Sequence, residues 1–279
     1  MALSKDFASS YGPWAVVTGA SSGIGEQFAH QLAAAGLNVV LVARRADRIH
    51  RIAAELAEHY GVEVDSVVLD LATPDFLEPL LAACVGKDVG LLVSNAGVGL
   101  KGPHAEISPE KLNKMLDLNC RAPMQLARSF APRLIERGRG GFIFTGSIEA
   151  RQGFPYSAAY AATKAFVQSF GESLWVEFGS QGVDVLVVNP GPTDTEALSL
   201  QGMDASSMRG LMPPGVVAAH ALAQLGRGPV TVAGRLNRVL MRSLSFLPRR
   251  LALTLAGRGM LDAIAKGRAS GEHQAPPRQ

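Results

Sequence analysis

The chain has 279 residues, which is enough for one domain with a single large hydrophobic core. Its net charge is only +3 and it carries no RNA- or DNA-binding motif, so nucleic acid is not an expected partner. The content of 47% hydrophobic and 18% charged residues is typical of a soluble globular protein.

The sequence also lacks the marks of a secreted, disulfide-bonded or metal-binding protein. Its two cysteines, Cys84 and Cys120, lie far apart, and its six histidines form no ligand pattern, so neither a disulfide framework nor a metal site is expected. Residues 1–6 contain no apolar signal core, and no uncharged apolar run is long enough to span a bilayer. We therefore expect a cytoplasmic protein.

Short apolar runs alternate with helical patterns and short turns, which predicts an α/β fold with a doubly wound parallel sheet. Strands are expected at residues 14–18, 38–43, 63–69, 89–94, 141–146, 183–188 and 229–232. Helices are expected at residues 24–35, 47–60, 74–84, 109–137, 157–180 and 215–225. The predicted organisation is one domain over 1–232, a helical extension over 233–269 and a disordered tail over 270–279, which contains two consecutive prolines.

A glycine-rich turn follows the first expected strand. Gly19, Gly23 and Gly25 let the backbone approach a pyrophosphate, and the helix that opens near Gly23 presents free N–H groups and a positive dipole end. Ser21 and Ser22 add hydroxyl donors. The turn therefore predicts a dinucleotide site, while a tight strand-to-helix connection without any ligand remains the alternative.

The second expected strand ends in two arginines, Arg44 and Arg45, and no acidic residue stands there. An acid at this place binds the ribose 2′-hydroxyl of NAD, whereas an arginine accommodates the 2′-phosphate of NADP. The pair predicts a preference for NADP(H) over NAD(H). The alternative is that both arginines simply cover the edge of the sheet.

Tyr160 and Lys164 are four residues apart, so they share one face of an expected helix. A nearby ammonium favours the phenolate and lowers the tyrosine pKa from its free value of about 10, which would allow proton transfer near neutral pH. Ser147 ends an apolar strand thirteen residues before the tyrosine. Alone, each of these residues has an ordinary explanation: a solvated helix face, a surface charge or a strand-end cap.

Together and in this order, the motifs resemble the short-chain dehydrogenase/reductase family, in particular its NADP-preferring bacterial branch similar to 3-oxoacyl and hydroxysteroid reductases. The resemblance extends from about Pro13 to Val232. It implies a Rossmann-type fold and reversible hydride transfer between NADP(H) and a carbonyl or secondary alcohol of a small molecule. We also expect a homo-oligomer, either a dimer or a tetramer.

The resemblance assigns roles to four residues. Tyr160 donates a proton to the developing alkoxide, and Lys164 lowers the pKa of Tyr160 and binds the nicotinamide ribose. Ser147 hydrogen-bonds the substrate oxygen and stabilises charge there. Asn119 stands within an expected helix, where asparagine is unfavourable, so we expect a kink whose exposed carbonyl holds a water near the lysine.

Further cofactor contacts follow from the resemblance at the strand ends. An aspartate after the third strand lies against the adenine amino group, and the turn after the sixth strand holds the nicotinamide carboxamide. Ser94 stands where the family more often has asparagine, which is a mild departure. The expected cofactor residues are Gly19, Ser21, Ser22, Gly23, Ile24, Gly25, Arg44, Arg45, Asp70, Leu71, Asn95, Ala96, Gly97, Tyr160, Lys164, Pro190, Gly191, Thr193 and Thr195.

Residues 196–212 correspond to the family's mobile substrate lid. The apolar residues of this segment suit a hydrophobic substrate, such as a 3-oxoacyl group, a steroid or another apolar ketone, and they suit a self-packed lid equally well. Glu149 would be an unusual acid if it faced the pocket. The apolar lid residues are Leu198, Leu200, Met203, Met208, Leu211 and Met212.

Three other functions stay open at this point. The protein could oxidise an alcohol in cells with the same site, because flux direction is not written in the sequence. It could be a non-catalytic NADP-binding sensor or scaffold, although such proteins typically lack the tyrosine or the lysine. The extended sugar-nucleotide epimerases are disfavoured, because their glycine turn is spaced differently and their C-terminal domain is usually larger.

The C-terminal segment has a separate pattern. From Ala205 to Leu261 there is no Asp or Glu, but eight arginines are present, and three of them share one helical face opposite an apolar face. A basic amphipathic helix of this kind packs on the protein or on a second subunit, or it docks on anionic lipid. The apolar face comprises Leu236, Val239, Leu240, Leu244 and Leu247, and the basic face comprises Arg235, Arg238 and Arg242.

Overall fold

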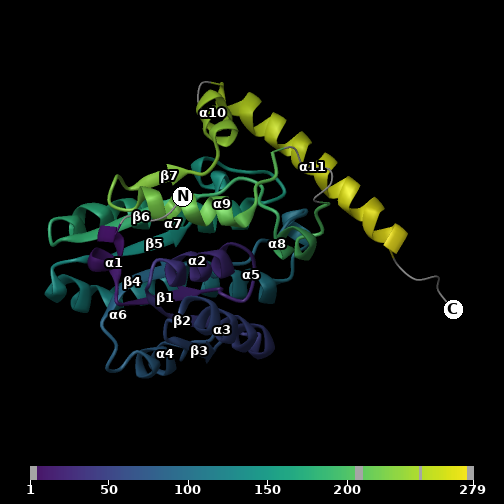
Figure 1. Ribbon diagram of the computed structural model, residues 1–279. Coiled ribbons are helices and arrows are strands. Elements are labelled where there is room, and N and C mark those ends of the chain that lie inside the picture. Colours follow the sequence, from purple (N-terminus) through teal and green to yellow (C-terminus); the bar gives the residue numbers. More distant parts are fainter. Residues whose placement is uncertain (1–4, 205–209, 245–246, 275–279) are drawn as a thin grey trace.

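The computed structural model describes residues 5–204, 210–244 and 247–274. Within these residues, a seven-stranded parallel sheet runs in the order β3-β2-β1-β4-β5-β6-β7 (Figure 1). The order reverses between β1 and β4, and sheets of this type bind ligands beyond the carboxyl ends of the strands at such a point. The strands are β1 (Trp14–Thr18), β2 (Asn38–Ala43), β3 (Val64–Val68), β4 (Val89–Ser94), β5 (Gly140–Thr145), β6 (Val183–Asn189) and β7 (Val230–Val232).

Helices cover both faces of the sheet, because its central strands are apolar on both sides. Phe28, Ile49 and Val217 belong to one core, which includes side chains of α1, α2, α3 and α9. Phe130 and Val167 belong to the other core, which includes side chains of α4, α6 and α7. The helices are α1 (Lys5–Tyr11), α2 (Gly23–Ala34), α3 (Ala46–Tyr60), α4 (Leu77–Ala83), α5 (Pro109–Leu116), α6 (Ala122–Arg137), α7 (Ala158–Gly179), α8 (Glu196–Leu200) and α9 (Pro214–Gln224).

The predicted strands are all present, with ends that differ by no more than one residue. The helix predicted over 109–137 is wrong as a single element, because a π-helical turn, η2 (Asp117–Arg121), separates α5 from α6. The sequence reading also missed α1, whose Phe7 and Tyr11 pack into the core, and the short helix α8. A helical face of two or three residues is too short for periodicity to reveal.

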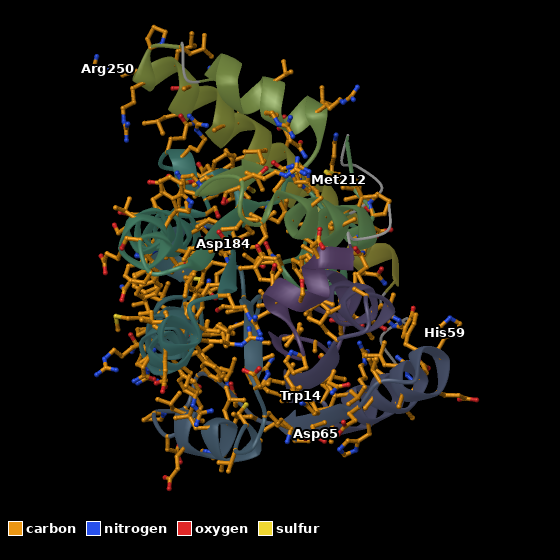
Figure 2. All side chains as sticks on the ribbon, turned by 60° about the vertical axis from the view of Figure 1, so that its left-hand side comes forward. Trp14, His59, Asp65, Asp184, Met212 and Arg250 are labelled. Atoms are coloured by element: carbon orange, nitrogen blue, oxygen red, sulfur yellow. The ribbon has the colours of Figure 1, made fainter. Side chains whose placement is uncertain are left out.

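The C-terminal segment forms the two expected helices, α10 (Arg235–Leu244) and α11 (Arg249–Gln274), which lie at one end of the molecule (Figure 1). Figure 2 shows Arg250, in the first turn of α11, at the opposite end of the molecule from Asp65. Disorder was expected from Ser270, but residues 270–274 continue α11, and residues 275–279 lie outside the described part of the chain.

Candidate active site

A cavity of about 650 Å³ lies along the carboxyl edge of the sheet. Its walls come from the ends of β1 to β6, from α7 and α8, and from Met260 of α11. The predicted catalytic residues Ser147, Tyr160 and Lys164 all line it. Every predicted cofactor residue lines it as well except Gly25, so segments far apart in the sequence form one site.

The predicted tyrosine and lysine lie one turn apart on α7. The Lys164 side chain is buried, and its Nζ donates a hydrogen bond of 2.7 Å to the carbonyl oxygen of Thr145, at the end of β5. The same Nζ lies 5.7 Å from the centroid of the Tyr160 ring. Ser147 follows β5, and its N–H donates to Asn189 Oδ1 at 3.0 Å. The ends of β5 and β6 thus fix the serine opposite α7.

Asn119 lies behind the cavity wall in the π-helical turn, which confirms the predicted interruption of the helix. Its side chain is buried, donates to Val98 O at 2.9 Å and Thr163 Oγ1 at 3.0 Å, and accepts from Val98 N at 2.9 Å. A Cβ atom at Gly97 would lie 3.2 Å from Asn119 Oδ1 and 3.3 Å from Lys164 Nζ. Gly97 therefore keeps open the space between the asparagine and the lysine.

Burial dominates the electrostatics of this end of the cavity. It lowers the pKa of Lys164 to about 8, against smaller raising effects of Cys120 and Glu149. Burial and the charge of Glu149 raise the pKa of Tyr160 above its ordinary value, and a hydrogen bond with Ser147 offsets only part of that rise. The expectation of a lowered tyrosine pKa is therefore wrong, because burial and the charge of Glu149 together outweigh the hydrogen bond with Ser147.

A buried ion pair that the sequence reading missed stands beside the tyrosine. Lys101 Nζ donates to Glu149 Oε1 at 2.6 Å and to Ser157 Oγ at 2.7 Å, and Ser157 donates to Glu149 Oε2 at 2.5 Å. The Lys101 and Glu149 side chains are only 4% and 14% exposed. Lys101 Nζ lies 4.6 Å from the centroid of the Tyr160 ring. The sequence left open whether Glu149 faces the pocket. It does line the cavity, where it is paired with Lys101.

The glycine turn forms the other end of the cavity. Gly19 has a φ of +67°, and a Cβ atom there would lie 2.9 Å from Ala96 Cα, so only glycine fits at this meeting of two strand ends. A Cβ atom at Gly25 would collide with the carbonyl oxygen of Gly19. The role of Gly25 is therefore close packing of α2 on the turn, while its neighbours line the cavity.

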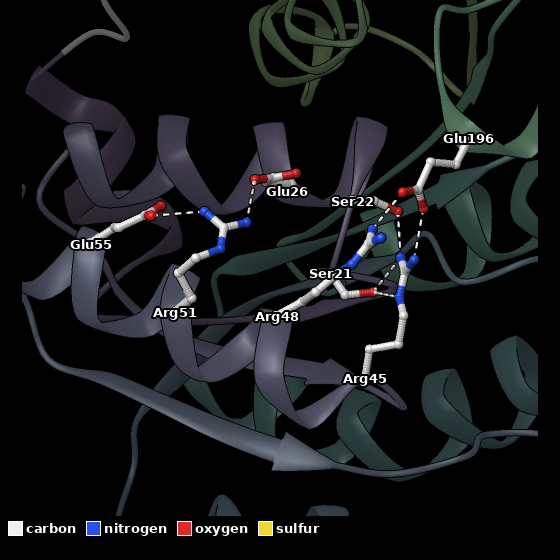
Figure 3. A network of polar contacts seen from close by, with 8 residues as sticks. All are labelled: Ser21, Ser22, Glu26, Arg45, Arg48, Arg51, Glu55 and Glu196. Atoms are coloured by element: carbon white, nitrogen blue, oxygen red, sulfur yellow. Dashed lines mark hydrogen bonds and ion pairs between the residues drawn. The ribbon is translucent and has the colours of Figure 1, made fainter.

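Two arginines converge at this end (Figure 3). Arg45 donates from Nε and Nη2 to Ser21 Oγ, at 3.1 and 2.9 Å, and from Nη2 to Ser22 Oγ at 2.7 Å. Arg45 Nη1 and Arg48 Nη1 both donate to the carboxylate of Glu196, at 2.7 and 2.6 Å. Helical spacing from Arg45 to Arg48 was the signal that could have revealed the second arginine.

The other predicted arginine, Arg44, points elsewhere. Its Nη1 lies 3.8 Å from Asp70 Oδ2, and its side chain is 61% exposed. Asp70 also accepts from Ala72 N at 3.1 Å and pairs with Lys114 at 3.2 Å. Although burial raises the pKa of Asp70, the Ala72 N–H and the two cations together lower it below its ordinary value. Asp70 is therefore a fixed carboxylate at the edge of the cavity.

Comparison with known proteins identifies the class to which this fold and site belong. Residues 13–204 match the short chain dehydrogenase family, and the chain belongs to that family. A 7beta-hydroxysteroid dehydrogenase of Clostridium sardiniense is 31% identical over 261 residues, which cover 93% of this chain and 100% of that protein. An inactive hydroxysteroid dehydrogenase-like protein 1 of Homo sapiens is 32% identical over 225 residues, which cover 79% of this chain and 68% of that protein.

Solved structures agree with this assignment. A structure from work on 7beta-hydroxysteroid dehydrogenase stereoselectivity matches with a TM-score of 0.84 and 27% identity, covering 90% of this chain and 99% of that one. A short-chain dehydrogenase from Sphingobium yanoikuyae in complex with NADPH matches with a TM-score of 0.76 and 30% identity, covering 85% of this chain and 96% of that one. The protein is thus an oxidoreductase acting on CH–OH groups, which interconverts a carbonyl and an alcohol.

Among residues 5–204, 210–244 and 247–274, no helix is long and apolar enough to cross a membrane. Over the same ranges, no group of three or more His, Cys, Asp and Glu side chains is placed to hold a metal ion.

Proposed function

We propose that this protein uses NADPH to reduce an apolar ketone to a secondary alcohol, and that it catalyses the reverse oxidation with NADP⁺. The observation that carries the proposal is the convergence of Ser147, Tyr160 and Lys164 at one end of a cavity whose other end is lined by Arg45, with Arg48 bound to the same carboxylate. The end with Tyr160 suits proton transfer, and the end with the arginines suits a phosphate group. A dinucleotide-dependent reductase needs both.

The residues at the nucleotide end fit NADP(H). Two guanidinium groups and two serine hydroxyls gather at the end of β2, and the N-terminus of α2 opens beside them. Guanidinium groups are favourable partners for phosphate oxygens, and helix N-termini bind anions. Arg45 and Arg48 would hold the 2′-phosphate, and the turn from Gly19 to Gly23 would hold the pyrophosphate. When bound, the cofactor supplies the hydride.

The reacting end assigns a role to each polar side chain. Tyr160 is a neutral phenol at neutral pH, because its pKa lies above the ordinary tyrosine value, and it therefore carries the proton that the substrate oxygen needs during reduction. Ser147 faces the same cavity and would stabilise charge on that oxygen. Lys164, anchored on Thr145, would hold the nicotinamide ribose, and the Asn119 carbonyl would hold a water of the proton relay.

Apolar walls support a hydrophobic substrate. Met203 and Met260 are 8% and 7% exposed, and they meet at the cavity from the segment after α8 and from α11. Flexible thioether side chains adapt to varied apolar shapes. Met208 of the predicted lid lies outside the described residues. The apolar side chains that line the cavity include Val98, Ile148, Phe154, Leu198, Leu200, Met203 and Met260.

The alternative is a non-catalytic NADP-binding sensor or scaffold on the same fold. One human relative carries the word inactive in its name, so family membership alone does not decide the question. In this chain, however, Tyr160 and Lys164 are both present and both line the cavity. That arrangement favours the catalytic function.

The test is a reduction assay with the purified protein and a panel of carbonyl compounds, from small sugars to 3-oxoacyl thioesters and steroid ketones. We expect NADPH to be consumed with at least one apolar ketone. NADPH binding without turnover of any panel member would support the sensor instead. Strong activity confined to small polar sugars would contradict the hydrophobic-substrate part of the proposal.

We propose a homo-oligomer, a dimer or tetramer, that is assembled through the outer face of α7. Phe166, Trp175 and Val176 on this helix are 36%, 39% and 65% exposed, although all three are large and apolar. Water contact of this apolar area is unfavourable, so a second copy is a suitable partner. Light scattering should show an assembly that Val176→Glu and Trp175→Glu together dissociate, and a monomeric unmodified protein would contradict this.

The protein is further proposed to be cytoplasmic with peripheral contact to anionic membranes through α10 and α11. Leu236 and Val239 on α10 are 67% and 65% exposed, and Leu251 and Leu255 on α11 are 47% and 45% exposed, beside several arginines. The side chains of residues 240–246 lie outside the described part. Sedimentation with anionic vesicles at low salt should capture the protein, and Leu251→Glu with Leu255→Glu should release it. Equal sedimentation with neutral vesicles would contradict electrostatic docking.

A further inference from the structure

Glu196 contacts the nucleotide end of the cavity from the opposite wall. Its Oε2 accepts from Arg45 Nη1 at 2.7 Å and its Oε1 accepts from Arg48 Nη1 at 2.6 Å (Figure 3). The carboxylate comes from the first residue of α8, which is 151 and 148 positions away from these arginines in the sequence. One side chain therefore ties the segment on the substrate side directly to the proposed phosphate site.

The two arginines form a prepared anion site. Ser21 and Ser22 accept from Nε and Nη2 of Arg45, which orients Nη1 toward the anion. The Glu196 carboxylate supplies one negative charge to the two guanidinium groups that it bridges. A phosphate monoester carries about −1.5 to −2 charges near neutral pH and has three acceptor oxygens. It therefore matches the paired guanidiniums better than a carboxylate does.

We propose that Glu196 is an internal surrogate for the 2′-phosphate: it occupies the site of Arg45 and Arg48 in the free protein, and a 2′-phosphorylated nucleotide displaces it. The inference rests on the proposed NADP(H) function and adds a coupling to it. Binding of NADP(H) frees the start of α8 from the nucleotide end, whereas a nucleotide with a free 2′-hydroxyl leaves the contact in place. Two anions compete for one site, and the competition links cofactor identity to the substrate side of the cavity.

The neighbouring ion pairs supply a matched control (Figure 3). Arg51 pairs with Glu55 at 2.7 Å and with Glu26 at 4.0 Å, one turn further along α3. Within the described part of the chain, Arg51 is not one of the residues that line the cavity. Glu55→Gln therefore removes a carboxylate of similar exposure, 47% against 42% for Glu196, from the same surface, and it leaves the carboxylates that act on Arg48 in place.

The experiment is calorimetric titration of the full-length protein with 2′,5′-ADP and with ADP, which differ in the 2′-phosphate. We expect Glu196→Gln to bind 2′,5′-ADP about fivefold more tightly than the unmodified protein, the upper range of an exposed ion pair. ADP binding should change by less than about twofold. Glu55→Gln should leave both affinities unchanged. With Arg45→Ala and Arg48→Ala present, the gain from Glu196→Gln should disappear, because nothing remains to compete for.

The outcomes separate the two proposals. If the unmodified protein prefers 2′,5′-ADP to ADP but Glu196→Gln does not increase that preference, the surrogate role is overturned and the NADP(H) preference survives. If neither protein distinguishes the two nucleotides, both proposals are overturned. A gain for ADP equal to the gain for 2′,5′-ADP would also overturn the surrogate role, because it would show a general electrostatic effect on anion binding.

Discussion

The two ends of the cavity each hold an ion-paired carboxylate, Glu149 with Lys101 and Glu196 with two arginines, yet the two arrangements differ in their surroundings. At the reacting end, the Lys101 and Glu149 side chains are 4% and 14% exposed. At the nucleotide end, Arg45 and Glu196 are 39% and 42% exposed. The closest contacts are nearly equal, 2.6 Å and 2.7 Å. The two pairs therefore differ in solvent exposure and not in distance.

Solvent access decides what each pair is able to do. Water screens the exposed pair, so its contribution to stability is about 0–1 kcal/mol and it can open without a large cost. Breaking a buried pair leaves an uncompensated charge in the interior, which costs about 3–5 kcal/mol. The reacting end is thus built from groups that must stay together, while the nucleotide end is built from groups that can exchange partners.

The largest effect is expected from Tyr160→Phe, which removes only the phenolic hydroxyl. Turnover of the best ketone should fall by about 10³-fold or more, because the substrate oxygen loses its proton donor. NADPH affinity should change little, as the ring remains in place. Steady-state kinetics and a binding titration check both statements. Near-normal turnover by this variant would contradict the proposed mechanism.

The contrast in stability comes next. Glu149→Leu should lower the free energy of unfolding by about 3–5 kcal/mol, because Lys101 would remain buried without its partner. Glu196→Leu removes a carboxylate at a similar distance from its cation but should cost no more than about 1 kcal/mol. Urea denaturation of the two variants compares them directly. Equal losses would show that burial does not separate the two ends of the cavity.

The pH dependence of alcohol oxidation sharpens the same contrast. Oxidation needs Tyr160 as a base, and the negative charge of Glu149 is one cause of its raised pKa. Glu149→Gln should therefore lower the pKa of Tyr160 and move the rising limb of kcat/KM to lower pH. Lys101→Met leaves the charge of Glu149 uncompensated and should move that limb to higher pH. Shifts of the two variants in the same direction would contradict this account.

A smaller effect is expected for cofactor selection. Arg45→Ala with Arg48→Ala should weaken NADPH binding by about tenfold or more, the scale of one charge-assisted contact, with NADH binding nearly unchanged. Arg44→Ala should have less effect, because its guanidinium points toward Asp70 and is 61% exposed. Fluorescence titrations with both cofactors measure the ratio. Equal binding of NADH and NADPH by the unmodified protein would contradict the expected preference.

The smallest effect should come from Glu55→Gln, which breaks an exposed i,i+4 pair with Arg51 on α3. A pair of this kind contributes about 0.3–0.5 kcal/mol to stability, and salt reduces it further. The melting temperature should barely move, and activity should be unchanged. A loss comparable to that of Glu149→Leu would mean that this network matters more than its exposure indicates.

Most of the fold was predictable because parallel strands that are buried on both faces appear as uninterrupted apolar runs. That Ser147, Tyr160 and Lys164 line one cavity was expected from the resemblance to the short-chain dehydrogenase family, which rests on the order and spacing of these residues. The pairing of Lys101 with Glu149 could not be predicted, because the two residues are 48 positions apart and neither lies in a predicted helix or strand. The direction of the Tyr160 pKa shift was also predicted wrongly, since the sequence indicates which charged residues lie near the phenol but not how deeply the phenol is buried.

The wall contributed by α11 lies outside the part of the chain that matches the family, which ends at residue 204. Met260 reaches the cavity from this helix, and a Cβ atom at Gly257 would lie 3.2 Å from Pro155 of the loop before α7. The part of the cavity wall that α11 contributes is therefore separate in sequence from the segments that carry Tyr160 and the glycine turn. Under the proposed function, we expect mutations at Met260 to change which substrates are accepted while Ser147, Tyr160 and Lys164 stay in place, so that substrate range could change without loss of the catalytic residues.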